Sequence, residues 1–581
     1  MKKLILLSVL LIVGCLFGTT INVPADSQTI QAGINEAKEG DTVLVAVGTY
    51  TENIDFNSKT LVMIGEDRET TIIDGNNSGR VVNISDSSVL SNFTIQNGAN
   101  STPLKGSGIN ASGSTVLNNL IVKNNTNEQN EGAGLFLDGS PGNSPRLTNS
   151  LVIDNTGDGI VVHGVNSLIS NVTITNNTIA GILLRPSGSN AHPTVINSII
   201  YGNLDNNQVK FSNNGGQAIE ISYSIIQEGQ DSITTFTNDT LNWGTGNIDM
   251  NPMFADTASG DFRLLALSPA INAGHPDSTD SDGSRADMGG YPYLNTFVGP
   301  VWYVDSTNGS NITGTGSSFS AFANIGPAIR FAADGDSINV AAGTYVENVD
   351  FDGKNLKLVG VDREATIIDG NSSGAAVRMT NYIDQALLKN FTIQNGSSEE
   401  GGGLYVLNSD PTLKNLMIKN NASTWNGGGI FCNGASPIIE DVTILSNSAV
   451  NVSGGIHFIN GSNAKLTNVD IINNAAAADG GGINCYGSSP NIYKVTLVGN
   501  TSGNGGGIFC GDGSSPNVLN TVIADNYPQE IYFDESSTGD SISISFSVVK
   551  NGQSGITTND NGTVMWGLGN IDIDPMFTDT A

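Results

Sequence analysis

The sequence is poor in charged residues, and most of the charge that it has is of one sign. Charged residues make up 14 % of the 581 residues, with 24 Lys and Arg against 55 Asp and Glu, so the formal net charge is −31. Nucleic-acid binding depends on clustered Lys and Arg that neutralise phosphates. We therefore predict no nucleic-acid partner and no binding to anionic membrane surfaces. Neutral sugars, cations or proteins are left as partner classes.

Apolar runs long enough to cross a membrane are absent beyond the N-terminus. At the N-terminus, Met1, Lys2 and Lys3 precede the short apolar run Leu4 to Val13, a pattern typical of a secretory signal. Residues 1–18 are expected to be a signal peptide, or a lipoprotein signal in which Cys15 carries the lipid. Either reading predicts an exported protein, extracellular or at the outer surface, with a membrane contact only through that lipid.

The sequence contains two copies of one unit. The segment Gly40 to Asn53 recurs 295 residues later as Gly335 to Asn348. Near the other end, Trp243 to Asp249 recurs 323 residues later as Trp566 to Asp572. The second copy is therefore longer by 28 residues, which is close to one additional turn of the shorter repeat described next.

These matches predict two domains after the signal. Copy 1, with a C-terminal cap and linker, is expected at 19–298, and copy 2 at 299–581. Because Ala581 aligns with Ala258, copy 2 is expected to be truncated at its C-terminus relative to copy 1. We expect a monomer.

A shorter repeat of about 22 to 27 residues runs through both copies. Each repeat has a Gly-rich strand start, here called the coil start, and an Asn that ends a β-branched run. The coil starts are Ile109, Leu135, Ile160, Ile182, Leu404, Ile430, Ile456, Ile483 and Ile508. The Asn column is Asn125, Asn155, Asn177, Asn203, Asn421, Asn447, Asn474, Asn500 and Asn526. Asn tolerates left-handed backbone angles, and stacked amides can bond one another.

This period, with short strands between Gly, Ser-Pro and Asn turns, predicts the coils of a parallel β-helix, stacked about 4.8 Å apart. A solenoid needs covered ends, and Ser27 to Ala37 carries Ile30 and Ile34 at helical spacing with Ser27 as the expected N-cap. We predict an all-β fold of two tandem right-handed parallel β-helices, each with a short N-terminal capping helix.

Several segments resemble the secreted right-handed parallel β-helix proteins of bacteria, in the pectate-lyase-like superfamily. The carriers are the opening Thr29 to Ile34 with Gly48-Thr49-Tyr50, the coil start Gly427 to Cys432, and the closing Ser268 to Gly274. The resemblance implies the fold over nearly the whole mature chain. It implies no single activity, because the superfamily includes lyases, hydrolases, esterases and members without known catalysis.

One activity-bearing family shares part of this pattern. Pectin methylesterases have a Gly-x-Tyr-x-Glu opening, present here as Gly48 to Glu52. Their catalytic Gln-Ala-Val and Asp-Phe-x-Phe-Gly segments have no match, and the catalytic signatures of polygalacturonases are missing as well. The resemblance therefore implies the fold but identifies no catalytic residues.

Alternation of strand faces sorts the residues that follow each coil start. Position +2 points inward and includes Cys432, Cys485 and Cys510, three of the four cysteines. Cys485 and Cys510 lie on adjacent coils, so they are either stacked thiols or a disulfide. Their spacing does not suit a metal site.

Position +1 points outward and is unusually aromatic in copy 2. It holds Tyr405, Phe431, His457 and Phe509. Rings stacked along a flat sheet can bind the faces of sugar rings. We predict a glycan-binding surface there, and the alternative is that a loop or another segment covers the rings.

Position +3 in copy 1 gives Asp138, His163 and Arg185 on three successive coils. An acid, an imidazole and a guanidinium about 5 Å apart could supply a base, an acid and a carboxylate clamp for polysaccharide cleavage. The alternative is a surface ion pair at strand ends.

An acidic stretch in the linker of copy 1 has the look of a calcium loop. Its carboxylates are Asp277, Asp280, Asp282 and Asp287, within eleven residues, and oxygen ligands suit Ca²⁺. An ordinary acidic linker is the alternative. We expect no required cofactor, with calcium as the one cation that the sequence suggests.

Together these features favour an exported, non-catalytic scaffold for surface adhesion or glycan binding. The rival is a polysaccharide lyase or hydrolase that acts on the outer face of copy 1 through Asp138.

Overall fold

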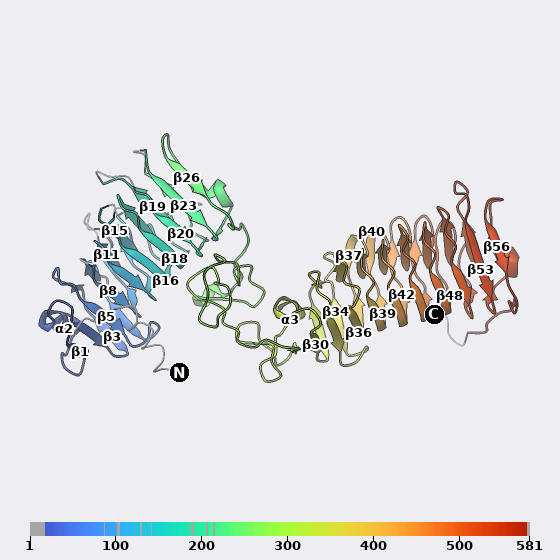
Figure 1. Ribbon diagram of the computed structural model, residues 1–581, viewed down its shortest axis with the longest axis horizontal. Coiled ribbons are helices and arrows are strands. Elements are labelled where there is room, and N and C mark those ends of the chain that lie inside the picture. Colours follow the sequence, from blue (N-terminus) through green and yellow to red (C-terminus); the bar gives the residue numbers. More distant parts are fainter. Residues whose placement is uncertain are drawn as a thin grey trace. The chain divides into compact units, whose positions relative to one another are not determined.

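The computed structural model describes residues 18–577, except 86, 101–104, 128–130, 141, 188–190, 205–206 and 213–214. The chain divides into two compact units, of which the first ends at Asn295 and the second begins at Thr296 (Figure 1). Each unit is a solenoid of short strands, most of them paired in parallel with the strand one coil away.

Unit 1 contains a large sheet and a smaller one. The sixteen-stranded sheet comprises β1 (Thr20–Val23), β2 (Thr42–Val45), β3 (Gly48–Thr51), β5 (Val62–Gly65), β6 (Thr71–Asp74), β8 (Val89–Ser91), β9 (Thr94–Gln96), β12 (Val116–Asn118), β13 (Ile121–Lys123), β16 (Arg146–Ile153), β18 (Leu168–Thr175), β20 (Thr194–Ile196), β21 (Ile199–Tyr201), β23 (Ala218–Ser222), β24 (Ile225–Ile226) and β26 (Thr240–Trp243). The eight-stranded sheet comprises β4 (Ile54–Asp55), β7 (Val82–Ile84), β11 (Ile109–Ser112), β15 (Leu135–Asp138), β17 (Ile160–His163), β19 (Ile182–Arg185), β22 (Val209–Phe211) and β25 (Ile233–Thr234). Two further pairs are β10 (Ala99–Asn100) with β14 (Thr126–Asn127), and the antiparallel β27 (Phe254–Asp256) with β28 (Asp261–Leu264).

Unit 2 repeats this plan, and its described strands form three sheets. The fifteen-stranded sheet comprises β29 (Val301–Val304), β30 (Ser337–Val340), β31 (Gly343–Val346), β33 (Lys357–Gly360), β34 (Thr366–Asp369), β36 (Leu387–Gln394), β39 (Thr412–Lys419), β42 (Ile438–Leu445), β45 (Lys465–Ile472), β48 (Asn491–Val498), β50 (Asn517–Leu519), β51 (Val522–Ala524), β53 (Ser541–Ser545), β54 (Val548–Val549) and β56 (Thr563–Trp566). The nine-stranded sheet comprises β32 (Val349–Asp350), β35 (Val377–Thr380), β38 (Leu404–Leu407), β41 (Ile430–Asn433), β44 (Ile456–Ile459), β47 (Ile483–Tyr486), β49 (Ile508–Gly511), β52 (Ile531–Phe533) and β55 (Ile556–Thr557). The four-stranded sheet comprises β37 (Ser397–Glu400), β40 (Ala422–Asn426), β43 (Ser448–Ala449) and β46 (Ala475–Ala476).

The prediction of an all-β parallel β-helix is confirmed by these sheets. Position +2 of each predicted coil is fully buried, as the alternation of faces requires. Cys432, Cys485 and Cys510 occupy that core column as free thiols, although Cys485 and Cys510 are register partners on β47 and β49. Burial raises the pKa of all three thiols, to about 12 for Cys510, so they behave as core side chains.

The Asn column forms hydrogen-bonded ladders inside both units. In unit 2 the side-chain amide of each Asn donates to the side-chain oxygen of the next, at 2.9 to 3.0 Å from Asn421 through to Asn526. The left-handed backbone angle lies one residue earlier than predicted, for example at Asn420 with φ 55° and Asn473 with φ 53°. The ladder residue itself faces inward, and its neighbour makes the turn.

The described residues contain two α-helices, α2 (Ile30–Glu36) and α3 (Ile325–Phe331). The prediction of Ser27 as N-cap is wrong. Thr29 caps α2 by accepting from the Ala32 N–H at 3.1 Å, because Ser27 lies two residues too early and its hydroxyl donates to Glu36 instead.

A segment after β26 packs along the side of unit 1. Phe254 and Phe262 of the antiparallel pair, with Tyr291, lie against Ile121, Leu151 and Ile153 of the large sheet. Arg68 holds the end of this segment, since its guanidinium donates to the Gly290 carbonyl and lies 4.1 Å from the Tyr291 ring centre. No α-helix in the described part of the chain has the length and apolar character needed to span a bilayer.

Candidate functional site

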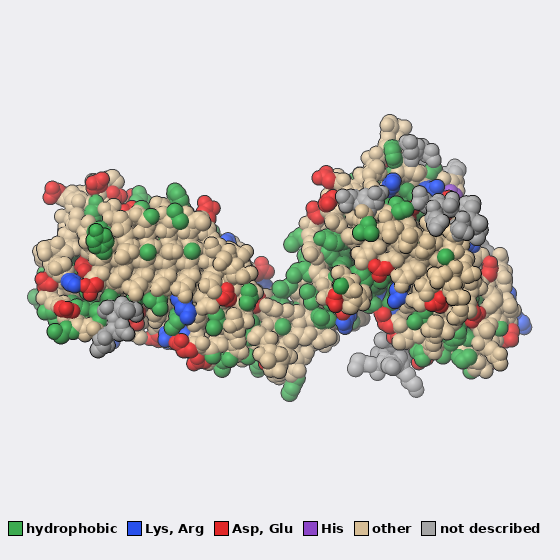
Figure 2. All heavy atoms as spheres, turned by 180° about the vertical axis from the view of Figure 1, so that it is seen from behind, with side chains coloured by type: hydrophobic (Ala, Val, Ile, Leu, Met, Phe, Trp, Pro, Cys, Tyr) green, Lys and Arg blue, Asp and Glu red, His purple; other side chains and the backbone are tan. Residues whose placement is uncertain are grey.

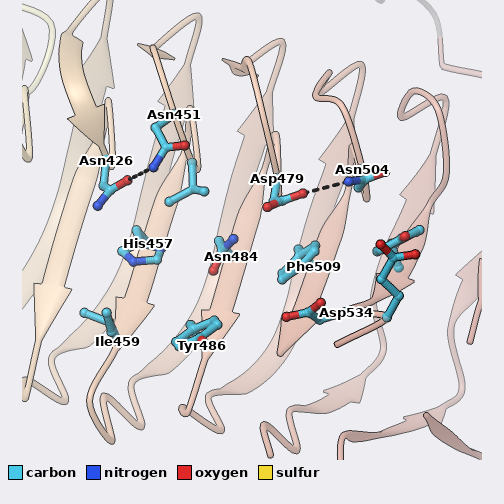
Figure 3. Close-up of a pocket in the computed structure, with 13 residues that line it drawn as sticks. Asn426, Asn451, His457, Ile459, Asp479, Asn484, Tyr486, Asn504, Phe509 and Asp534 are labelled. Carbon is cyan, nitrogen blue, oxygen red and sulfur yellow. Dashed lines mark hydrogen bonds between the residues drawn. The ribbon is translucent and has the colours of Figure 1, made fainter. Parts of the chain in front are cut away.

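A groove of about 420 Å³ lies on the outer face of the nine-stranded sheet in unit 2. Its middle row is position +1 of four successive strands, β44, β47, β49 and β52. Figure 3 shows this row between two others, one from the loops before the coil starts and one from the strand ends. The middle row is His457, Asn484, Phe509 and Tyr532; the loop row is Asn426, Asn451, Val452, Asp479 and Asn504; the strand-end row is Ile459, Tyr486, Asp534 and Glu535.

Ladder pairing between coils positions the loop row. Four residues before successive coil starts, Asn426 pairs with Val452, and Asp479 pairs with Asn504, as isolated parallel bridges. Asn504 also donates its side-chain amide to the Asp479 carboxylate at 2.9 Å (Figure 3). The row is therefore built by the same coil stacking as the strands, which holds its amides and carboxylates at fixed positions beside the groove.

One glycine lies where three of the groove's side chains meet. Gly511 is the register partner of Tyr486 on the next strand. A Cβ placed there would lie 3.2 Å from both the Phe509 and the Tyr486 rings and 3.3 Å from the Asp534 Cβ. Three of the groove's side chains thus converge on the space above this glycine.

The predicted aromatic column divides into a part beside the groove and a part that lines it, and Phe431, His457 and Phe509 are all buried. Tyr405, Phe431 and His457 stack in series, with ring centres 5.6 and 5.5 Å apart, and Phe431 is 1 % exposed. Tyr405 and Phe431 do not line the groove. Phe509 does, and its ring stacks on Tyr532 at 5.8 Å.

Two buried polar side chains in the middle row each have one atom without a hydrogen bond to the described residues. His457 is 3 % and Asn484 is 2 % exposed, and within the described residues neither His457 Nδ1 nor Asn484 Oδ1 has a hydrogen bond. Burial lowers the pKa of His457 to about 4, although Asn484 acts to raise it. The imidazole is therefore neutral near pH 7, and an unsatisfied buried polar atom costs about 1–3 kcal/mol.

The groove carries negative charge. Asp479, Asp534 and Glu535 line it, and no Lys or Arg is among its described lining residues. Burial raises the pKa of Asp479, the hydrogen bond from Asn504 lowers it, and the nearby Asp534 carboxylate raises it further. The two carboxylates therefore repel one another, and none of the described lining residues places a cation between them.

In unit 1 the predicted residues Asp138, His163 and Arg185 are in register on β15, β17 and β19. His163 Nδ1 lies 3.0 Å from Asp138 Oδ1, and Lys105 Nζ lies 2.9 Å from Asp138 Oδ2. Arg185 pairs with Glu131 at 2.8 Å. The structure thus brings the first two together and directs the third to another carboxylate.

The ion pairs of this cluster lie above three buried apolar side chains, which we call the apolar floor. Phe136, Val161 and Leu183, at position +1, form a small buried cluster outside the main core. Lys105 Nζ lies 4.8 Å from the centre of the Phe136 ring, so the ion pairs lie over the place that forms the groove in unit 2.

Both oxygens of the Asp138 carboxylate have partners. Partial burial acts to raise its pKa, but the bonds from His163 and Lys105 lower it to about 2. The Gly139 N–H also donates to Oδ1 at 3.0 Å. A carboxylate with this pKa is a weak base at neutral pH, and its observed contacts are those of a cross-link.

The acidic linker residues support the backbone of their own loop. Asp287 accepts the N–H groups of Asn272 and Tyr293, both at 2.6 Å, and Asp280 accepts the Asp287 N–H at 2.8 Å. Asp282 accepts from Ser284 and Asn295. The Asp277 N–H donates to His275.

The calcium site stays a prediction. Over residues 18–577 with the gaps noted above, no three His, Cys, Asp or Glu side chains are grouped so as to hold a metal ion. Cys15, the predicted lipidation site, lies outside the described residues.

Sequence reasoning missed most of the groove. Asn451, Asp479, Asn504 and Tyr486 belong to loops or strand ends, and Tyr532 belongs to a coil beginning at Ile531 that lacks the Gly-rich start. The sequence does contain a pattern that indicates the loop row, namely the residue four positions before each coil start. That column reads Glu400, Asn426, Val452, Asp479 and Asn504.

No protein-family model matches the chain, and no curated protein matches it in sequence. Solved structures with similarity include the pectate lyase Pel9A, with 15 % identity and a TM-score of 0.29, covering 48 % of this chain and 96 % of that chain. The pectin methylesterase from carrot has 14 % identity and a TM-score of 0.27, covering 47 % and 91 %. A PL6-family alginate lyase has 13 % identity and a TM-score of 0.26, covering 96 % and 98 %.

At such identities and scores the likeness concerns the fold alone, and any function has to be argued from the groove itself.

Proposed function

We propose that this chain is an exported, non-catalytic β-helix that binds glycans, and that the groove of unit 2 is its binding site. The observation that carries the proposal is the combination of accessible rings and fixed polar groups in one hollow. Tyr486 is 40 % exposed, and Tyr532 is half-buried beside the amide-bearing loop row. Sugars present apolar ring faces and hydroxyl edges, which aromatic rings and amides complement.

The dimensions suit a short stretch of polysaccharide. The middle row crosses four strands, which at about 4.8 Å per step gives a length of about 14 Å. The volume of about 420 Å³ falls in the range of ligand sites, about 300–1,000 Å³. Adhesion to a glycan-coated surface is a use that such a groove would support.

The absence of catalysis is supported by the state of the Asp138 cluster in unit 1. Its carboxylate is held by Lys105, His163 and a backbone N–H, and the apolar floor beneath it is buried. A polysaccharide lyase or hydrolase that used Asp138 as a base would first have to release this carboxylate from Lys105.

The first test measures retention on a panel of neutral, acidic and amine-bearing polysaccharides. Tyr486→Ala and Tyr532→Ala are each expected to weaken retention about tenfold, because each removes a stacking ring worth about 1 kcal/mol or more. Tyr382→Ala is the matched control, since Tyr382 is 72 % exposed in the same unit and does not line the groove. Far-ultraviolet circular dichroism confirms folding of each variant.

Unsaturated products and reducing ends are followed on the same panel. Retention that is unchanged in both groove variants would remove the groove as the binding site. Cleavage that disappears in Asp138→Asn would instead establish the rival activity of unit 1.

A further inference from the structure

Both units place the same three positions around this face, and unit 1 shows how they hold an ammonium group. Lys105 lies four residues before a coil start, and its Nζ reaches Asp138, at position +3 of the next coil, at 2.9 Å. The same Lys105 Nζ lies 4.8 Å from the centre of the Phe136 ring, at position +1 of that coil. An ammonium is thus held between a carboxylate and an aromatic face.

Unit 2 has the carboxylate and the ring but not the cation. The corresponding residues are Asn504, four residues before β49, with Tyr532 on β52 and Asp534 directly after it. The backbone at the first position is alike, since the following glycines, Gly106 and Gly505, have φ of 64° and 59°. The side chain of Asn504 bonds to Asp479.

Asp534 is left without a cationic partner among the described residues. Its Oδ1 accepts from the N–H and the hydroxyl of Ser536, both at 2.9 Å. Asp479 and Glu535 add two more carboxylates to the groove, and Asp534 raises the pKa of Asp479 through its charge. A positive group bound here would relieve this repulsion.

The other polar groups of the groove also favour a ligand rich in donors. Asn484 Oδ1 lacks a hydrogen-bond donor within the described part of the chain, and the neutral His457 has an unpartnered Nδ1. The carboxylates and the Asn484 oxygen are acceptors, and hydroxyl or ammonium hydrogens of a ligand suit them. A uronate sugar would instead bring its own carboxylate against them, which costs free energy for every like-charged contact.

We infer that the groove of unit 2 binds an amino sugar, with the ligand's ammonium group beside Asp534 over the Tyr532 ring, where unit 1 places the ammonium of Lys105. This inference rests on the proposed function and names its ligand class. A bare divalent cation fits less well, because the described residues offer no group of three ligands for one.

The test is calorimetric titration of the full chain with three oligosaccharides of equal length: glucosamine, N-acetylglucosamine and galacturonate. The glucosamine oligomer is expected to bind at least about tenfold more tightly than its acetylated form, since acetylation removes the charge but keeps the ring. The galacturonate oligomer is expected not to bind. Raising the salt concentration should weaken the glucosamine complex selectively.

Two variants examine the charge directly. Asp534→Asn keeps the shape and should weaken glucosamine binding about tenfold, a clearly larger loss than for the acetylated oligomer, which brings no charge to this carboxylate. Asn504→Lys should restore the arrangement of unit 1 and abolish glucosamine binding, because the chain then supplies its own ammonium. Asp352→Asn is the control, since it removes one charge at an exposed turn of the same unit whose φ of 52° suits Asn.

The outcomes of these experiments distinguish the amino-sugar inference from the proposed glycan-binding function. Equal binding of glucosamine and N-acetylglucosamine, unaffected by Asp534→Asn but lost in Tyr486→Ala, would overturn the amino-sugar inference and keep the glycan groove. Tight binding of galacturonate would also overturn it. Binding that survives in Tyr486→Ala and Tyr532→Ala would overturn the proposed site itself.

Discussion

Inside each unit the side chain of one residue type links successive coils. Asn474 donates its amide to Asn500 at 3.0 Å and to the Ile444 carbonyl at 2.9 Å, and its Oδ1 accepts from both the side chain and the backbone of Asn447. The side chain is buried. Every polar atom of this amide is therefore satisfied by a coil above or below it, which makes the ladder a specific constraint on coil stacking.

Asn474→Ala should destabilise unit 2 by about 3 kcal/mol. The substitution leaves the Asn447 amide and the Asn500 oxygen with fewer partners in a buried site, and each unsatisfied group costs about 1–3 kcal/mol. Urea unfolding followed by circular dichroism measures the change. Asn491→Ala, at an exposed site on β48, should stay within about 0.5 kcal/mol; equal effects of the two substitutions would contradict a structural role for the ladder.

At the scale of elements, a glutamate that directly follows a strand caps a helix in each unit. The Glu52 carboxylate accepts the N–H groups of Ile30 and Gln31 at 2.8 and 2.9 Å. Glu347 accepts those of Ile325 and Gly326 at the same two distances. A carboxylate at a helix N-terminus satisfies free N–H groups and meets the positive end of the helix dipole. The Gly-x-Tyr-x-Glu opening thus has a structural role in this chain.

Removing the two carboxylates should have unequal effects. α2 retains its own cap from Thr29, whereas Asn324 of α3 makes no side-chain capping bond. Glu347→Ala should therefore cost about 2 kcal/mol, and Glu52→Ala about half as much. Thermal unfolding of the full chain, with hydrogen exchange to assign each transition to a unit, provides the measurement. A larger loss for Glu52→Ala would show that α3 is capped in another way.

Elements also show where prediction from sequence stops. The Gly-rich period locates the strands, and alternation places Asp138, His163 and Phe509 on the outer face, because both depend on spacing along the chain. Lys105 and Asp479 each lie four residues before a coil start, so the period places them in one column but does not give the partners of their side chains. Their side chains come from loops whose positions depend on hydrogen bonds to the neighbouring coil, and a one-dimensional period does not contain those bonds.

At the scale of the whole molecule, two copies of one template carry different surfaces. Carboxylates are spread over both units, and Lys and Arg are fewer (Figure 2). In unit 1 the scarce cations Lys105 and Arg185 lie over the outer sheet, while unit 2 leaves the equivalent face open as a groove. The core residues that the two units share predict their common fold. The residues that differ between the units on the outer face determine whether that face is accessible.

Unit 1 should also lose stability as pH rises, through the segment that packs on its side. Burial raises the pKa of Asp287 to about 7, and the charge of Asp280 adds a smaller increase, although two backbone N–H bonds act to lower this pKa. Burial also raises the pKa of Asp280, to about 6. A carboxyl whose folded pKa is raised contributes stability that is fully present below its unfolded pKa, near 4, and is lost as pH rises through the folded value. The loss between pH 5 and pH 8 should be on the order of 2 kcal/mol.

Hydrogen exchange of peptides from 268–293 in the full chain, corrected for intrinsic rates, measures this loss as falling protection between pH 5 and pH 8. Asp280→Asn should flatten the profile, because it removes one titrating group and the charge that acts on Asp287, while its amide oxygen can still accept the Asp287 N–H. Asp138, with its pKa held near 2, does not titrate in this window, so Asp138→Asn serves as the control with an unchanged slope. Protection that rises with pH would mean that Asp287 is ionised in the fold and stabilised by its two N–H bonds.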